Sequence, residues 1–455
     1  MRLILHSGLV EELQKDDLSV AVLVPKLGSA ESVRLRDRYG VEVLELPNLN
    51  RLANQNLELL RRYLFEDVAG NFALRARHER VMAGTMSKAK FRVSALYLVN
   101  RLVHPIPGIR TGLERVQRRF YRNAEVAEML KNLAPRIVVS TYPANPLEGV
   151  VLAESARSGI LTVIQLLSWD NITSKGHFTV LGDRFVTWGP IMTDEIKEFY
   201  NVDDSDIAEV GVPHFDAHMK AATPERIAAE RQRLGLPTDQ PYIFFGMSSP
   251  FIAPTEIDIV EALADRTNAD EFGPEMHLLV RPHPQNLYGN MADHSWISRL
   301  DAMKGPRVVI DYPSIIKGSL PWMMQEEDLF SLGNLLSGAA VTVNSGSTLS
   351  IDAMIHDRPV VLTAFDLGEE LPWWQSASRG IKFTHNAKLV ALKGLRVAGS
   401  FDELMTHLKA YIENPRLDEE GREASRRMEC GPCDGQSVTR TADAFHRWLQ
   451  TTARQ

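Results

Sequence analysis

The stretch Val341-Thr342-Val343-Asn344-Ser345-Gly346-Ser347-Thr348-Leu349-Ser350-Ile351-Asp352-Ala353-Met354 runs from an apolar strand through a turn of small residues into a helix. This strand–turn–helix step is the unit from which parallel α/β sheets are built. Such a turn can bind a phosphate, because backbone N–H groups and the positive end of the helix dipole meet there. The plainer alternative is ordinary capping of the helix by Ser345 or Ser347.

Two further turns follow predicted strands. Arg281-Pro282-His283-Pro284 ends the run 276–280, where Arg281 offers a bidentate donor for phosphate and His283 can donate a hydrogen bond or a proton. Gly246-Met247-Ser248-Ser249-Pro250 ends the run 242–245. We expect the three turns to converge on one crevice, because ligands of doubly wound sheets bind at the carboxyl ends of the strands.

The rest of the chain repeats this alternation of short β-rich runs and helical stretches, which predicts parallel β–α units. We predict an α/β protein of two Rossmann-like, doubly wound domains facing across a cleft. The predicted domains are 1–230, with a basic helical insertion near 61–122, and 231–435, followed by a C-terminal helix over 436–455. Strands are predicted at 19–25, 41–47, 135–140, 162–167, 185–188, 207–211, 242–246, 276–281, 307–310, 340–343 and 359–362.

The N-terminus allows two interpretations. Residues 2–5 are apolar enough to form the first strand. Alternatively, Leu5, Leu9 and Leu13 recur every four residues, which favours a helix over 2–15 and leaves the first strand of the fold missing.

Composition narrows the class of protein. The 455 residues are 44% hydrophobic and 24% charged, as in an ordinary globular protein, and the net charge of −7 argues against general nucleic-acid binding. Two cysteines, without the long apolar region of a signal peptide, predict a reducing compartment. We expect a cytoplasmic protein without a transmembrane helix, with peripheral attachment to the inner face of the membrane as an option.

The segment 61–122 is strongly basic. It holds fourteen Lys and Arg residues against four acids, and apolar and aromatic residues are interspersed among them. Such a segment can face anionic lipid or an anionic substrate, or its arginines can simply be solvated.

Together, Arg281-Pro282-His283-Pro284, the turn 344–348, the helix that follows it and Asp357-Arg358-Pro359 resemble the donor domain of GT-B glycosyltransferases. More narrowly, they are similar to bacterial surface-polysaccharide transferases, including polysialyltransferases and CDP-glycerol glycerophosphotransferases. The stretches 168–171 and 211–216 also resemble segments of such enzymes. The resemblance covers roughly residues 140–361.

The resemblance implies roles for particular residues. Ser345, Gly346, Ser347 and Thr348 would hold the donor phosphates, and His283 with Arg281 would contact the phosphate or assist departure of the nucleotide. Asp352 would accept hydrogen bonds from the donor ribose, although many such enzymes carry glutamate there. Ser248 and Ser249 would line the same site.

An inverting transferase also needs a base for the acceptor. Asp170 follows the predicted strand 162–167 and is the first candidate, although a turn or helix-capping role is the simpler explanation. His6 is a second candidate only if residues 2–5 form the first strand.

Three signals carry less weight. Cys430-Gly431-Pro432-Cys433 spells a redox motif, but it lies near the C-terminus rather than after a first strand. Asp204-Ser205-Asp206 matches a metal-binding motif of another glycosyltransferase fold but sits in a polar turn. The pair Trp373-Trp374 could stack on a sugar or base, or pack between domains.

The sequence therefore predicts a metal-independent glycosyltransferase without a cofactor. It would move a sugar from a nucleotide-activated donor to a glycan or lipid-linked acceptor in surface polysaccharide synthesis. The alternatives are a CDP-glycerol-type glycerophosphotransferase, a nucleotide-sugar epimerase of the same fold, and a non-catalytic scaffold. The sequence leaves the sugar, the nucleobase and the acceptor open.

Overall fold

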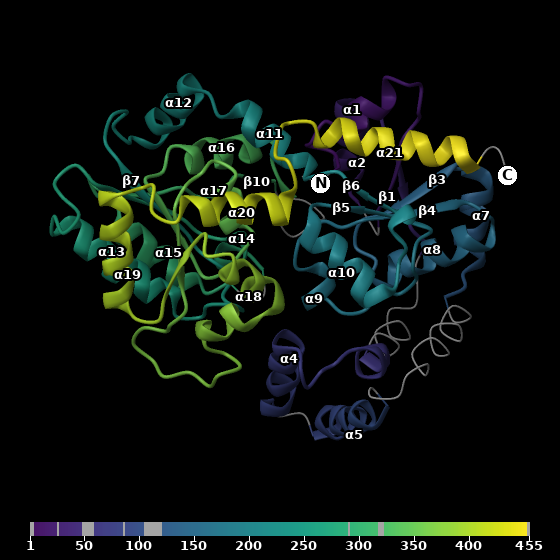
Figure 1. Cartoon of the computed structure of the whole chain (residues 1–455), viewed down its shortest axis with the longest axis horizontal. Coiled ribbons are helices and arrows are strands. Elements are labelled where there is room, and N and C mark those ends of the chain that lie inside the picture. Colours follow the sequence, from purple (N-terminus) through teal and green to yellow (C-terminus); the bar gives the residue numbers. More distant parts are fainter. Residues whose placement is uncertain are drawn as a thin grey trace. The chain divides into compact units, whose positions relative to one another are not determined.

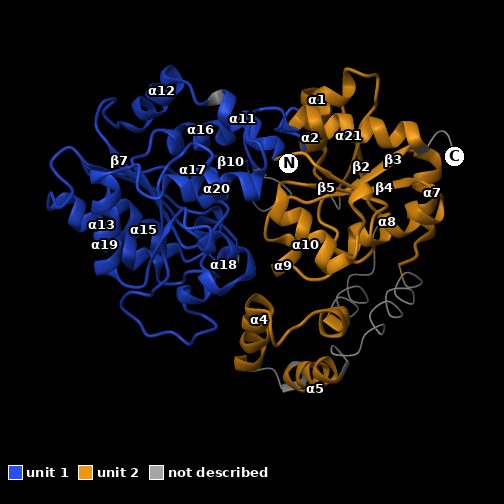
Figure 2. Ribbon diagram, in the orientation of Figure 1, with its two compact units in different colours: residues 1–8, 212–437 blue, residues 9–211, 438–455 orange. Residues whose placement is uncertain are grey.

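A computed structural model describes residues 4–24, 27–47, 59–84, 87–103, 121–289, 292–316 and 323–452. The chain forms two compact units, and neither unit is one continuous segment (Figures 1 and 2). Unit 1 comprises residues 1–8 and 212–437, and unit 2 comprises residues 9–211 and 438–455. The chain passes from one unit to the other after residues 8, 211 and 437, whereas the sequence placed the boundaries after 230 and 435.

Unit 1 is built on a six-stranded parallel sheet with the order β14-β13-β12-β7-β8-β9. Chain order runs outward from β7 through β9 and then restarts at β12 on the other side, which is the doubly wound topology, with its switch point between β7 and β12. The strands are β7 (Tyr242–Gly246), β8 (His277–Arg281), β9 (Val308–Ile310), β12 (Val341–Asn344), β13 (Val360–Thr363) and β14 (Arg396–Ala398).

Helices cover both faces of this sheet, and its central strands β7, β8, β12 and β13 are therefore buried at every position. Ile243 and Phe245 face the core shared with α13, α15 and α19. On the other face, Tyr242 donates from its hydroxyl to the carbonyl of Leu335 in α16, and Arg231 of α12 lies 4.7 Å over the Tyr242 ring.

Helices and short elements complete unit 1. They are α11 (Pro213–Ala221), α12 (Pro224–Leu234), α13 (Glu256–Asn268), α14 (Pro284–Leu287), α15 (His294–Met303), α16 (Glu326–Ser337), α17 (Leu349–Met354), α18 (Thr384–Ala391), α19 (Phe401–Glu413), α20 (Glu419–Cys430), the 3-10 helix η2 (Ala377–Lys382) and the antiparallel pair β10 (Ile315–Ile316) and β11 (Met323–Met324).

Unit 2 holds a four-stranded parallel sheet with the order β3-β4-β5-β6 and a separate parallel pair, β1-β2. Its last helix, α21, comes from the far end of the chain, and the guanidinium of Arg440 in α21 donates to the carbonyl of Val210 at 2.8 Å. The elements are α1 (Leu9–Gln14), β1 (Ala21–Val24), α2 (Ser29–Tyr39), β2 (Glu42–Glu45), α4 (Phe72–Ala83), α5 (Ser87–Val103), α7 (Ala124–Leu133), β3 (Ile137–Ser140), α8 (Pro146–Arg157), β4 (Leu161–Gln165), α9 (Asn171–Ser174), β5 (Arg184–Thr187), α10 (Pro190–Tyr200), η1 (Asp204–Asp206), β6 (Ile207–Glu209) and α21 (Ser437–Thr452).

The predicted fold class is confirmed, and a strand lies in every range where one was predicted. β14 and the short pair β10-β11 were not predicted. β14 is a three-residue strand, Arg396-Val397-Ala398, and a run this short with one apolar residue beyond alanine carries no period-2 signal.

The N-terminus matches neither interpretation in full. Residues 4–8 form turns rather than a strand, and α1 begins only at Leu9. Gly8 has a φ of +88°, which ends any continuous helix from residue 2. His6 is therefore not at the end of a strand, and the condition on which it was a candidate base is not met.

The described part of the basic segment is helical over residues 59–65, α4 and α5, and residues 66–71 form a non-helical connection before α4. Residues 104–120 of this segment lie outside the described part of the chain. Arg61 is 4% exposed and donates to the carbonyl of His177, so this basic residue is structural rather than part of a surface. Within the described ranges, none of the helices combines the length and apolar character needed to cross a bilayer.

Gly421→Ala tests a close backbone contact in unit 1. A Cβ on Gly421 of α20 would lie 2.2 Å from the carbonyl oxygen of Lys393, and a backbone atom cannot swing away as a side chain can. We expect a loss of about 1–3 kcal/mol in the free energy of unfolding, measured by denaturant titration. Gly305→Ala is the control, since its Cβ would meet its nearest neighbour only at 4.0 Å. Equal stability of the two variants would contradict the proposed clash.

Candidate functional site

The three predicted turns follow β7, β12 and β8, which are adjacent strands at the switch point of the unit 1 sheet. Their carboxyl ends therefore lie along one edge, as the sequence predicted. This edge is where ligands bind in doubly wound sheets.

Asn344 organises the turn after β12. Its side-chain oxygen Oδ1 accepts hydrogen bonds from the backbone N–H of Gly346 at 2.9 Å and of Ser347 at 3.0 Å, and from the hydroxyl of Ser350 at 3.1 Å. The N–H groups that we expected to be open to a phosphate are thus satisfied by the chain itself. An asparagine side chain commonly mimics a turn in this way, and the sequence analysis had given Asn344 no role.

Gly346 is the position of this turn that requires glycine. Its φ is +82°, and a Cβ would lie 2.7 Å from Nδ2 of Asn386. That amide donates to the carbonyls of Gly346 and Gly380, which fixes the outer side of the turn.

Ser345 points into the core. Its hydroxyl donates to the carboxylate of Glu256 and forms a 2.7 Å hydrogen bond with the hydroxyl of Thr363. The side chain of Ser345 is 3% exposed and is not directed toward a ligand. Ser347 and Thr348, by contrast, are only half-buried, which leaves them as the hydroxyl residues at the rim of this turn.

Glu256, at the start of α13, joins the turns after β7 and β12. Its carboxylate accepts from the backbone N–H of Ser248 at 2.6 Å and from the hydroxyl of Ser345. Burial raises the pKa of Glu256 to about 7, while the two hydrogen bonds lower it in part. The sequence gives no sign of this role, because an acid in the first turn of a helix normally indicates an exposed residue that interacts favourably with the helix dipole.

His283 caps the short helix α14. Its Nδ1 accepts a hydrogen bond from the backbone N–H of Gln285 at 3.1 Å. A ring nitrogen that accepts carries no proton, so this contact assigns the proton of the neutral imidazole to Nε2. The half-buried ring can then donate a hydrogen bond from Nε2, which is one of the two roles predicted for His283.

Buried polar atoms gather at this edge. The hydroxyl of Ser248, Oδ1 of Asn286 and Nδ2 of Asn344 are buried and have no hydrogen-bond partner within the part of the chain that the structure describes. Asn286 donates from its other amide atom to the carbonyl of Ser248 at 3.2 Å, so these two residues are in contact. Buried polar atoms without partners are rare in native proteins, and a bound ligand is one way to satisfy them.

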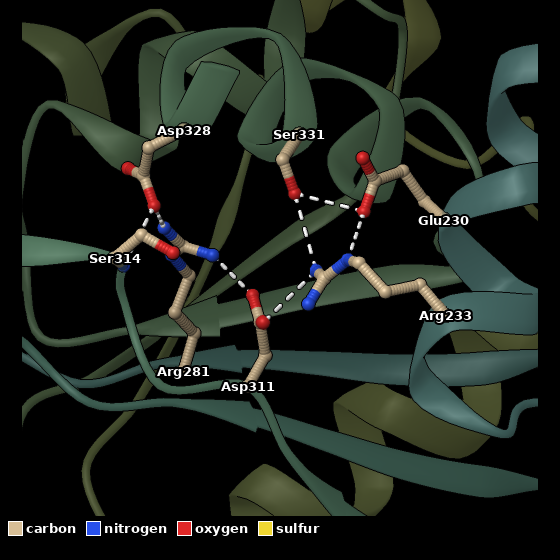
Figure 3. A network of polar contacts seen from close by, with 7 residues as sticks. All are labelled: Glu230, Arg233, Arg281, Asp311, Ser314, Asp328 and Ser331. Carbon is tan, nitrogen blue, oxygen red and sulfur yellow. Dashed lines mark hydrogen bonds and ion pairs between the residues drawn. The ribbon is translucent and has the colours of Figure 1, made fainter. Parts of the chain in front are cut away.

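Arg281 has a different environment from the one predicted. Its two terminal nitrogens donate to the carboxylates of Asp311 and Asp328, and all three side chains are buried (Figure 3). Arg233 continues the network through its contacts with Asp311 and Glu230. Because Arg281 is 8% exposed, its predicted contact with a donor phosphate would require its buried surroundings to rearrange.

Three other predicted site residues lie as follows. Ser249 is half-buried, and its carbonyl accepts hydrogen bonds from the backbone N–H groups of Ile252 and Ala253 in the turn after β7. Asp352 is 6% exposed within α17. Burial raises the pKa of the Cys430 thiol in α20, and the negative charge of Asp352 adds a smaller contribution to this rise. Asp170, in unit 2, precedes α9, accepts from the hydroxyl of Ser174 at 2.8 Å and pairs with Lys175 at 2.9 Å.

The discounted signals are local features. Cys430 is the last residue of α20 and Cys433 lies in the turn that follows, so the pair does not open a helix, and their thiols lie within hydrogen-bond reach. Asp204 pairs with Lys197, and Asp206 pairs with Arg184 at 2.8 Å. Trp373 lies in the loop after β13 and is 37% exposed.

An open groove of about 500 Å³ also follows β13. Its polar lining is acidic and hydroxylic rather than basic, which suits the hydroxyl groups of a ligand better than its phosphates. The lining residues include Phe365, Asp366, Glu369, Leu371 and Ser376.

The sequence matches one family model. The model describes CDP-Glycerol:Poly(glycerophosphate) glycerophosphotransferase and covers residues 118–446. No curated protein sequence matches the chain.

Solved structures share the fold at low sequence identity. MnaA from S. aureus, solved with UDP, is similar with a TM-score of 0.57 and 12% identity, over 98% of this chain and 94% of that one. The UDP-GlcNAc 2-epimerase of Neisseria meningitidis bound to UDP-GlcNAc has a TM-score of 0.56 and 11% identity, over 98% of each chain. These similarities confirm the predicted GT-B type of fold.

Arg281→Met tests the buried ion network. The substitution removes the cation between two buried carboxylates, so we expect a loss of about 3–5 kcal/mol in the free energy of unfolding, measured by denaturant titration. Arg233→Met is the matched control, because Arg233 is half-exposed and should cost about 1 kcal/mol or less. If both variants unfold at the same denaturant concentration, the network does not depend on Arg281.

Glu256→Gln tests the buried carboxyl. Its folded-state pKa lies above the unfolded value, so the folded protein keeps a proton that the unfolded chain releases between about pH 4.5 and 7. The free energy of unfolding of the wild type therefore falls as the pH rises from about 4.5 to 7, because Glu256 must ionise while buried. We expect the stability of Glu256→Gln relative to the wild type to increase by about 3 kcal/mol from pH 5 to pH 8.

Glu261→Gln, on the same helix, is the control for this pH series. Hydrogen bonding to Arg299 lowers the pKa of Glu261, so its protonation does not change between pH 5 and 8. A difference between Glu256→Gln and the wild type that is flat over this range would refute the raised pKa.

Proposed function

The chain belongs to the CDP-glycerol:poly(glycerophosphate) glycerophosphotransferase family, and on that basis we propose that it transfers glycerophosphate from CDP-glycerol to a surface-polymer acceptor. The observation that carries the proposal beyond the family is the edge of the unit 1 sheet. There, Ser347, Thr348 and Nε2 of His283 offer hydrogen-bond donors that suit phosphate oxygens. Buried polar atoms of Ser248, Asn286 and Asn344 have no hydrogen-bond partner among the described residues.

The proposed reaction is a phosphoryl transfer. A hydroxyl of the acceptor attacks the β-phosphorus, a new phosphodiester bond forms, the anhydride bond breaks, and CMP leaves with its electron pair. The proton of the acceptor hydroxyl passes to a base. The transition state of such a transfer carries negative charge on the phosphate oxygens, which the protein must stabilise. A hydrogen-bond donor that is already fixed in place stabilises this charge without any rearrangement of the protein.

His283 supplies that donor in our proposal. Because Nδ1 accepts from the backbone N–H of Gln285, the ring is a donor at Nε2. Protonation of Nδ1 would place its N–H opposite the N–H of Gln285, with no acceptor between these two donors. We therefore assign His283 to hydrogen bonding with the phosphate rather than to proton transfer.

Asp170 stays the proposed acceptor base. Its carboxylate pairs with Lys175 at 2.9 Å and accepts from the hydroxyl of Ser174, and these two contacts fix its position. We also propose that the reaction needs no metal ion, which assays with and without EDTA test directly. Asp352 is proposed to reach the donor ribose, and Arg281 to reach a donor phosphate, only if binding rearranges their buried surroundings.

Transfer of a sugar is the second candidate. The hydrogen-bond donors at the sheet edge suit the phosphate groups of a donor. They do not distinguish a glycerol from a sugar attached to those phosphates. The acidic groove after β13 suits hydroxyl groups of either glycerol or a sugar. MnaA and the Neisseria meningitidis epimerase, which have the same fold, are described with UDP and UDP-GlcNAc, so a UDP-sugar belongs in the assay.

The test is nucleotide release by the full chain with poly(glycerophosphate) as acceptor, comparing CDP-glycerol with UDP-N-acetylglucosamine. We expect CMP release from CDP-glycerol and about 10²–10³-fold lower kcat in His283→Ala, since one preorganised donor to the transition state is lost. His283→Gln should retain more activity than His283→Ala, because its amide can donate.

His294→Ala is the matched control, because His294 is an exposed histidine of the same unit. It should leave kcat unchanged. Turnover of the UDP-sugar alone would replace our donor assignment with the second candidate, and full activity of a folded His283→Ala would remove the assigned role.

A further inference from the structure

α5 exposes an apolar stripe to solvent. Phe91 is 80% exposed, Leu98 62% and Leu102 65%. Together with Ala95, they are separated by four, three and four positions, so they lie on one face of the helix. Large side chains this exposed on a single helix face indicate an interaction surface rather than chance.

The orientation of α5 is fixed by its opposite face. Val93 is buried in a cluster with Tyr63, Val68 and Leu74. The amide of Asn100 is buried and donates to the carbonyls of Tyr63 and Glu66, at 2.8 and 2.6 Å. The ring of Tyr97 stacks on that of His78, with centroids 4.3 Å apart. The stripe therefore faces outward because the other side of the helix is already packed.

The charge around the stripe has one sign. No acid occurs from Arg80 to Val103, and this range contains Lys88, Lys90, Arg92 and Arg101. Arg92 is adjacent to Phe91, and Arg101 is adjacent to Leu102, and both are exposed. Cations therefore flank both ends of the apolar stripe.

We propose that α5 docks on an anionic lipid bilayer. Phe91, Leu98 and Leu102 would enter the boundary between headgroups and acyl chains, while Arg92 and Arg101 lie against anionic headgroups. Interfacial helices combine an apolar face with flanking cations in this way, and each cation near such a surface contributes about 1 kcal/mol. The lack of any acid over 24 residues favours a uniformly anionic partner over a protein surface of mixed charge.

This proposal goes beyond the transfer reaction and does not depend on the donor. It concerns a helix outside the sheet edge of unit 1, so vesicle binding and nucleotide release can fail separately. Loss of binding with intact turnover of a soluble acceptor would be a failure of docking alone.

The experiment measures flotation of the full chain with vesicles of phosphatidylglycerol in phosphatidylcholine, against pure phosphatidylcholine. We expect binding only to the anionic vesicles, reduced at high salt because the charges are screened. The triple variant Phe91→Ser/Leu98→Ser/Leu102→Ser should bind at least tenfold more weakly. Arg92→Gln/Arg101→Gln should weaken binding about tenfold or more at low salt.

Val33→Ser and Tyr288→Ser are matched controls, because these residues are 48% and 42% exposed on other elements. Both should bind as the wild type does, and circular dichroism should show every variant folded. The proposal is overturned if the wild-type protein does not bind anionic vesicles at low salt, or if the triple variant binds them as tightly as the wild type. Self-association of the wild type that the triple variant abolishes, without vesicle binding, assigns the stripe to a second copy instead.

Discussion

One buried carboxylate holds the candidate site together. Glu256 receives the backbone N–H of Ser248 and the hydroxyl of Ser345, and so it connects the turns that follow two adjacent strands of the sheet. The turn after β12 is also held by Asn344 and Asn386, and Glu256 adds the connection to the turn after β7. The cost is a carboxyl removed from water, which the raised pKa of Glu256 records. The half-buried Ser347 and Thr348 at the rim depend on this interior arrangement for their position.

The sequence and the structure agree wherever periodicity carried the prediction. Buried parallel strands leave apolar runs, so β7, β8, β12 and β13 were all predicted, and their parallel arrangement followed from the alternation with helices. β14 was not predicted, because a strand of three residues that begins with an arginine is too short to show the two-residue alternation of a strand. At the N-terminus, Gly8 with its positive φ excludes the continuous helix from residue 2, and residues 4–8 form turns rather than the alternative strand.

Side-chain direction was the part that the sequence could not supply. Ser345 and Ser347 are two residues apart in the same turn, yet Ser345 faces Glu256 in the core and Ser347 stays at the rim. Arg281 ends a strand at the expected edge, but two acids distant in sequence, Asp311 and Asp328, take its guanidinium. Such long-range polar partners leave no local pattern, and the contacts of Glu256 with Ser345 and of Asn286 with Ser248 were missed for the same reason.

The interleaving of the two units has a consequence for biosynthesis. Unit 2 consists of residues 9–211 and the final segment from 438, with the whole of residues 212–437 between them. On the ribosome, its sheet is therefore synthesised well before α21, whose Arg440 binds the carbonyl of Val210. Unit 1 can complete its sheet while unit 2 still lacks its last helix. A ribosome that stalls before residue 438 thus releases a chain with one finished unit and one unfinished unit, which quality-control proteases can recognise by the apolar surface that α21 normally covers.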